Sequence, residues 1–143
     1  MSELQRLRWA SLAAGLWWGS LSALCFVVVP LLFAHLPSAA LAGGMAARLF
    51  SAQTWLSCAC GLLLLMAVSR SESQTLAAWS QALMRPVVAG LLLALLLELA
   101  VAPRIVAARA EGQSLRLWHG LGSAMLALQW LCASAAFWRL ARR

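Results

Sequence analysis

The chain has 143 residues, of which 64% are hydrophobic and 10% are charged, and it carries a formal net charge of +7. A water-soluble domain of this length would need about a quarter of its residues charged to cover its surface, so the composition excludes a soluble globular protein and indicates one membrane domain. Most arginines lie at the ends of apolar runs, where they anchor helices to lipid headgroups, and they do not cluster on one face to bind nucleic acid. We therefore expect the lipid bilayer, and no nucleic acid, as a partner.

Four apolar runs follow one another along the chain. They predict helices over about 9–34, 45–69, 84–108 and 116–140. Each can cross a hydrocarbon core about 30 Å thick, which takes about 20 helical residues. We therefore predict an all-α integral membrane four-helix bundle, formed by residues 1–143 as a single transmembrane domain, with an up-down-up-down topology and both termini on the same side.

The first helix follows Arg6 and Arg8 and so resembles a signal peptide at its start. Its apolar run is longer than the roughly 7 to 15 residues of a signal core, so we predict a helix that stays in the protein. Gly15 and Gly19 form a GxxxG pattern, which lets two helix backbones approach closely. The pattern is compatible with packing inside the bundle or with a homo-oligomer.

Prolines and glycines mark expected changes in the backbone. The pair Pro37–Ser38 predicts a helix start, and Gly43–Gly44 predicts a break. Pro30 and Pro103 lie at similar places near the outer ends of the first and third helices, and each removes an amide donor, so we predict a kink or a helix end at both. Their matching positions indicate a weak repeat of a helix pair.

Glu98 is the most informative residue, because it sits about three turns into the third helix between Leu and Ala residues. A carboxylate at that depth should face the bundle interior and meet a partner or a proton. Its candidate partners in the same outer half of the bundle are Arg48 and Gln53 from the second helix, Arg104, and His119 from the fourth. Such a polar cluster is either an ion pair that sets helix register or a proton or ligand site.

His119 is also a candidate ligand for haem or copper, since imidazole suits both metals. The four cysteines all fall within apolar runs and are typical of small core residues. The sequence has no GxSxG, P-loop, HExxH or glycine-rich dinucleotide motif. We therefore expect no enzymatic activity.

The arginines also predict an orientation. On the side of the termini lie Arg6, Arg8, Arg70, Arg85, Arg139, Arg142 and Arg143, and on the opposite side lie Arg48, Arg104, Arg109 and Arg116. Because cytoplasmic segments carry the excess of basic residues, we predict cytoplasmic N- and C-termini.

Several short motifs are spread over nearly the whole chain. They are Trp18-Gly19, Pro30-Leu31-Leu32-Phe33, Leu36-Pro37, Ala42-Gly43, Leu49-Phe50, Pro103-Arg104-Ile105, and His119 with Ser123 four residues later. Together they resemble the bacterial domain-of-unknown-function family 4149. The resemblance implies four transmembrane helices and a bacterial inner-membrane location, and it implies no established activity. More distantly, the chain is similar to CopD-like copper-resistance membrane proteins and to a four-helix, haem-binding protoporphyrinogen oxidase.

Three functions remain open at this point. The first is a non-enzymatic inner-membrane protein with a packing, partner-binding or envelope-homeostasis role. The second is a haem- or copper-binding membrane protein that uses His119 near Glu98. The third is a proton-coupled small transporter with Glu98 as the proton site, which requires an oligomer because four helices leave little room for alternating access.

Overall fold

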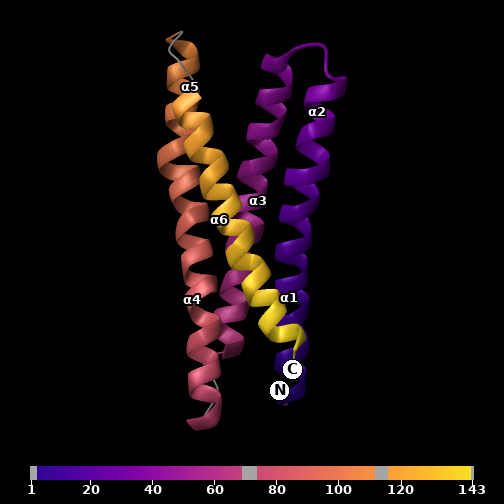
Figure 1. Cartoon of the computed structure of the whole chain (residues 1–143), viewed down its shortest axis with the longest axis vertical. Helices are drawn as coiled ribbons and strands as arrows, with labels where there is room; N and C mark the ends of the chain where they lie inside the picture. Colours follow the sequence, from indigo (N-terminus) through magenta and orange to yellow (C-terminus); the bar gives the residue numbers. More distant parts are fainter. Residues whose placement is uncertain (1–2, 69–73, 112–115, 143) are drawn as a thin grey trace.

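The computed structural model describes residues 3–68, 74–111 and 116–142, and every element in these ranges is a helix (Figure 1). The elements are α1 (Glu3–Ala23), the π-helical turn η1 (Leu24–Val28), α2 (Val29–His35), α3 (Ala39–Val68), α4 (Gln74–Leu96), the π-helical turn η2 (Leu97–Val101), α5 (Ala102–Ala110) and α6 (Arg116–Ala141). Because α1, η1 and α2 are continuous, as are α4, η2 and α5, the chain forms four long helices.

All four long helices could cross a membrane by length and composition. The candidate spans are Leu4–His35, Ala39–Ala67, Ser80–Ala110 and Arg116–Ala141. The all-α membrane fold predicted from the sequence is thereby confirmed. Both chain ends lie at one end of the bundle (Figure 1). We call this end the terminal end and the opposite one the distal end.

The second long helix begins at Ala39, directly after the predicted start signal Pro37–Ser38 and before the predicted boundary at about residue 45. Leu36 adopts an extended conformation with ψ 144°, which ends α2, because the residue before a proline is disfavoured in the α region. The hydroxyl of Ser38 then accepts a hydrogen bond of 3.2 Å from the amide of Leu41 at the start of α3. The predicted break at Gly43–Gly44 is wrong, since α3 runs through both glycines. In hydrocarbon no water replaces a lost backbone hydrogen bond, so a helix tolerates glycine there without opening.

The tightest packing lies towards the terminal end. The fully buried side chains include Trp17, Leu64 and Leu83. Gly90 of α4 accommodates the Trp17 indole, because a Cβ at Gly90 would lie only 2.6 Å from Cη2 of Trp17. The absence of a side chain at residue 90 therefore lets α1 and α4 pack closely.

The two glycines of the GxxxG pattern have different surroundings. A Cβ at Gly15 would lie 3.5 Å from the Phe137 ring of α6 in the same chain, whereas a Cβ at Gly19 would meet nothing within 4 Å. Gly15 thus serves packing inside the bundle.

The prolines coincide with both π-helical turns. The amide of Val29 bonds the carbonyl of Leu24, and the amide of Ala102 bonds that of Leu97, five residues earlier in each case. Pro30 and Pro103 come directly after these residues, and neither ends its helix. A proline ring clashes with the carbonyl four residues earlier, and the wider π-helical turn relieves that clash.

Candidate functional site

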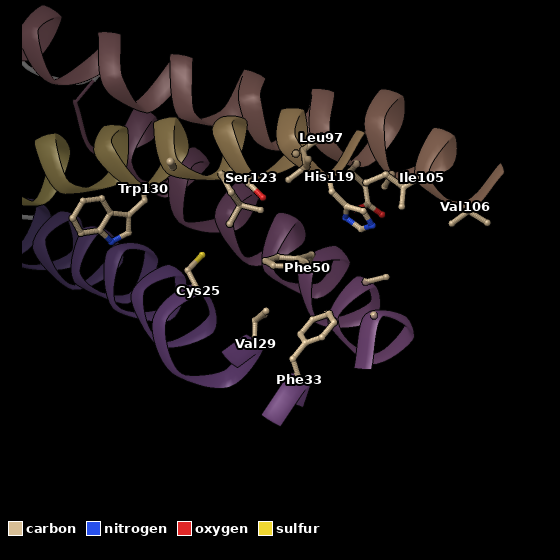
Figure 2. A pocket seen from close by; sticks show the side chains of 18 of the residues that line it. Cys25, Val29, Phe33, Phe50, Leu97, Ile105, Val106, His119, Ser123 and Trp130 are labelled. Carbon is tan, nitrogen blue, oxygen red and sulfur yellow. The ribbon is translucent and has the colours of Figure 1, made fainter. Parts of the chain in front are cut away.

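A cavity of about 710 Å³ lies in the distal half of the bundle. It is lined by residues of η1, α2, α3, η2, α5 and α6, so both π-helical turns contribute to its wall (Figure 2). Cys25 and Glu98 are both the second residue of their π-helical turn, five positions before the proline, and both line the cavity. The two halves of the chain thus contribute matching segments to one site.

Trp130 separates the cavity from the packed terminal half. Its Nε1 donates a hydrogen bond of 2.9 Å to the hydroxyl of Ser22, and its ring meets the Phe26 ring edge to face at 5.6 Å. Both contacts join α6 to the first long helix. They close the cavity at its inner end.

The cavity opens sideways. Its lining includes Phe26 and Phe33 of the first long helix, which are 63% and 52% exposed, and Leu131 of α6, which is 55% exposed. Ala46 of α3 and Gly122 of α6, which also line the cavity, are buried. The mouth therefore lies between the first long helix and α6, on a surface that contacts lipid when the spans cross a membrane.

Glu98 is held in the cavity wall by one hydrogen bond. The hydroxyl of Ser51 on α3 donates to Oε1 of Glu98 at 2.5 Å, and the carboxylate is half-buried. Within the part of the chain that the structure describes, Glu98 makes no ion pair. A carboxylate in a low-dielectric setting with a single donor is an unusual arrangement that points to function.

Of the predicted partners of Glu98, His119 alone shares the cavity with it. Arg48 is exposed and lies off the lining. Arg104 is also exposed, and its guanidinium carbon lies 5.3 Å from the centre of the Trp118 ring, in a cation–π contact outside the cavity. Both arginines thus lie away from the carboxylate that they were predicted to neutralise.

Gln53 belongs to a separate, buried network near the middle of the spans. Its Nε2 donates to the hydroxyl of Ser20 at 2.9 Å and to that of Ser57 at 3.4 Å, and Gln129 donates to Ser57 at 3.2 Å. These bonds join α1, α3 and α6, as interhelical polar contacts do in membranes. Gln53 points away from Glu98 because it is two positions, or about 200° of helix, from Ser51.

Arg109 lines the cavity, although the sequence did not point to it as a site residue. Its guanidinium reaches from α5 to α3, where a Cβ at Gly43 would lie 2.9 Å from Nη2. The glycine thus leaves room for the arginine at the distal end of the cavity. No spacing in the sequence pairs residue 43 with residue 109, since the contact depends on how α3 and α5 cross.

Aromatic side chains are the second feature that sequence reasoning missed. The cavity lining includes Phe26, Phe33, Phe50 and Trp130, which come from η1, α2, α3 and α6 in turn. Figure 2 shows Phe33 and Phe50 on the wall that faces His119. Each is an ordinary residue of an apolar run, and only the fold brings them to one site.

The metal-ligating residue types of the described chain do not form a cluster. Residues 3–68, 74–111 and 116–142 contain no group of three or more His, Cys, Asp or Glu side chains that could hold a metal. His119 is therefore a single imidazole on an apolar wall.

Comparison with known proteins places the chain in a family. No curated protein and no solved structure matches it, and the more distant similarity to CopD-like copper-resistance proteins is not borne out. Residues 12–114 match the family model described as a domain of unknown function, DUF4149. The match includes both π-helical turns, Ser51, Glu98 and Arg109, and it ends before His119. The predicted resemblance is confirmed, and the chain belongs to the DUF4149 family.

Proposed function

We propose that this protein is a non-enzymatic, multi-pass protein of the bacterial inner membrane that binds a small lipophilic or amphipathic molecule in its distal cavity. The observation that supports this proposal is the cavity itself, with a volume of about 710 Å³ and a mostly apolar wall. Binding sites for drug-sized molecules have volumes of about 300–1,000 Å³ and combine apolar walls with a few polar groups.

The sideways mouth supports a ligand that comes from the membrane. A lipophilic molecule is concentrated in the hydrocarbon, and it can enter between Phe33 and Leu131 without crossing the headgroup region. The polar groups that it would meet inside include Glu98 at the wall and Arg109 at the distal end. A ligand with an apolar body and one or two polar groups would fit an apolar wall that carries these polar side chains.

Binding is a better explanation than catalysis for these groups. Nucleophilic catalysis needs a base that a third group orients. Glu98 accepts a hydrogen bond from Ser51, and within the described ranges the side chains of these two residues form no further hydrogen bond with a group that could orient them. His119 lines the same cavity, and its role there is to contribute a polar surface for the ligand.

The arginines support cytoplasmic termini. The terminal end carries Arg6, Arg8, Arg85, Arg139 and Arg142 in the described ranges, while Arg70 and Arg143 lie outside the described residues. An excess of arginine marks the cytoplasmic side. The cavity then lies in the half of the membrane away from the cytoplasm.

A matched pair of substitutions tests cavity binding. Ala127 lines the cavity, whereas Ala124, one turn earlier on α6, is exposed and does not. Binding of the neutral fluorophore 1-N-phenylnaphthylamine is measured in lipid nanodiscs for the wild type, Ala127→Trp and Ala124→Trp. We expect Ala127→Trp to weaken binding about tenfold or more, equivalent to about 1.4 kcal/mol, and Ala124→Trp to leave it unchanged. Equal affinity in all three proteins would contradict the proposal.

Haem binding is a second candidate, favoured by one observation. The imidazole of His119 lines the cavity, and one axial histidine is enough to hold haem in an apolar pocket. Haem would bring its own redox chemistry, and Arg109 would be available for a propionate. An absorbance scan of protein purified in mild detergent from haem-supplied cells tests this. A Soret band that His119→Ala abolishes supports haem binding, and a colourless, well-folded protein excludes it.

A further inference from the structure

We infer that the ligand of the distal cavity is a lipophilic cation, with the Glu98 carboxylate as its counter-charge and aromatic rings around it. The inference rests on the cavity binding proposed above and adds the chemical class of the ligand. It is carried by the charge, the aromatic lining and the backbone of the cavity wall.

The carboxylate is the first argument. Glu98 is the acidic residue on the lining, and the hydroxyl of Ser51 occupies one of its acceptor positions. An ionised carboxylate has about four such positions. In hydrocarbon a charge with so little compensation favours a partner of opposite charge. Within the described ranges no arginine or histidine forms an ion pair with it, so a cation from outside the chain can take that place.

The basic groups of the cavity lie towards its distal end. Arg109 comes 11 residues after Glu98 on the same long helix, a separation of about 16 Å along the axis. Its guanidinium lies against Gly43 of α3. His119 lies on α6, three positions after the start of that helix at Arg116. Most other side chains of the lining are apolar, and Ser123 of α6 and Cys25 of η1 are among the remaining ones.

The aromatic side chains are the second argument. Phe26, Phe33, Phe50 and Trp130 line the cavity from four different elements. The face of an aromatic ring carries partial negative charge and attracts cations, most strongly where water is absent. Rings on several sides also suit a bulky apolar ligand body. A lipophilic cation uses both properties, whereas an anion would meet unfavourable ring faces and the Glu98 carboxylate.

The backbone is the third argument. Proline supplies no amide hydrogen, so one carbonyl of each π-helical turn lacks its helical donor. The missing donor would have bonded a carbonyl four or five residues before the proline. That carbonyl belongs to Glu98 or Leu99 in η2, and to Cys25 or Phe26 in η1. Both turns line the cavity. A carbonyl without its donor adds negative potential at each of these two turns.

Two probes of one shape and opposite charge test the inference. Tetraphenylphosphonium is a lipophilic cation, and tetraphenylborate is an anion of the same size. Each is titrated against bound 1-N-phenylnaphthylamine in nanodiscs, so that displacement reports occupancy of the cavity. We expect tetraphenylphosphonium to displace the neutral probe at a concentration at least about tenfold lower than tetraphenylborate does.

Charge-matched variants assign the effect to Glu98. Glu98→Gln removes the charge and keeps an oxygen that can accept from Ser51, and Glu111→Gln removes an acidic group that lies off the cavity lining. We expect Glu98→Gln to weaken displacement by tetraphenylphosphonium at least about tenfold and Glu111→Gln to leave it unchanged. Binding of the neutral probe to Glu98→Gln with wild-type affinity shows that the cavity is intact.

The outcomes separate the two proposals. If the neutral probe binds but tetraphenylborate displaces it as well as the cation does, or if Glu98→Gln leaves the cation unaffected, the cation inference is overturned and cavity binding stands. If the wild type binds none of the three probes, cavity binding itself is overturned, and the inference falls with it.

Discussion

The hydroxyl of Ser51 donates a hydrogen bond of 2.5 Å to the carboxylate of Glu98, and this bond ties α3 to the π-helical turn η2. The two residues come from different halves of the chain. Their bond fixes the position of the one acidic group on the cavity wall of the described structure. It therefore gives the cavity an acidic group in a defined position.

Removing the Ser51 hydroxyl should destabilise the bundle. Ser51→Ala leaves the Glu98 carboxylate without its donor, and interhelical hydrogen bonds in membranes are worth about 0.6 kcal/mol on average and up to about 1.7 kcal/mol. We expect a loss of about 1 kcal/mol in the free energy of unfolding, measured by SDS titration. Ser123→Ala is the control, because Ser123 lines the same cavity and makes no hydrogen bond in the described chain. Equal stability of the two variants would argue against a structural contribution of the Ser51 bond.

Adding a methyl group at Gly90 should separate α1 from α4. The new Cβ would lie 2.6 Å from Cη2 of the fully buried Trp17 and 3.2 Å from Cβ of Cys132. Overpacking of this kind costs about 1–3 kcal/mol, so we expect Gly90→Ala to lower the thermal midpoint in detergent. Gly120→Ala, where a Cβ would meet nothing within 4 Å, should be neutral or stabilising by up to about 1 kcal/mol. A Gly90→Ala protein as stable as Gly120→Ala would show that the helices do not pack this closely.

Replacing Pro103 should alter the cavity more than the fold. In Pro103→Ala the restored amide can bond a carbonyl of η2, and the π-helical turn can revert to an α-helix. A π-helical turn contains about one residue more than an α-helical turn, so this conversion would rotate α5 by about 100° relative to α4. The rotation would carry Arg109 off the lining. We expect weaker binding of 1-N-phenylnaphthylamine at unchanged helix content by circular dichroism. Pro86→Ala is the matched control, since Pro86 lies inside α4 without a π-helical turn and off the lining. Similar losses of binding in both variants would remove the special role of Pro103.

Occupancy of the cavity should protect Cys25 from modification. Cys25 lines the cavity, and Cys58 of α3 does not, although both are partly accessible. In variants that keep only one of these two cysteines, we expect 1-N-phenylnaphthylamine to slow the reaction of Cys25 with N-ethylmaleimide several-fold and to leave Cys58 unaffected. The rates are followed by mass spectrometry. Equal protection of both thiols would indicate a general effect of the probe on the membrane and not occupancy of the cavity.

The sequence by itself determined the spans and several backbone details. Runs of apolar residues are long enough to cross a bilayer, and no soluble fold could bury them, so the four helices follow from composition. The start of α3 after Ser38 follows from local capping chemistry. The same local reasoning pointed to Pro30 and Pro103 as the places where the backbone changes. It also identified Glu98 as the residue to examine, because a carboxylate in an apolar run is expensive wherever it points.

Only the tertiary structure decided which side of each helix faces the bundle. Leu62 and Leu63 are each 57% exposed, whereas Leu64 is fully buried. In a membrane the lipid is as apolar as the core, so a leucine suits both places and the sequence carries no periodic signal that separates them. Without that signal, the sequence indicated Gln53 as a partner of Glu98 and gave no reason to name Ser51. Where α3 crosses η2, Ser51 lies next to Glu98 and donates a hydrogen bond to it. The distal helices diverge, and the cavity between them is lined by Glu98.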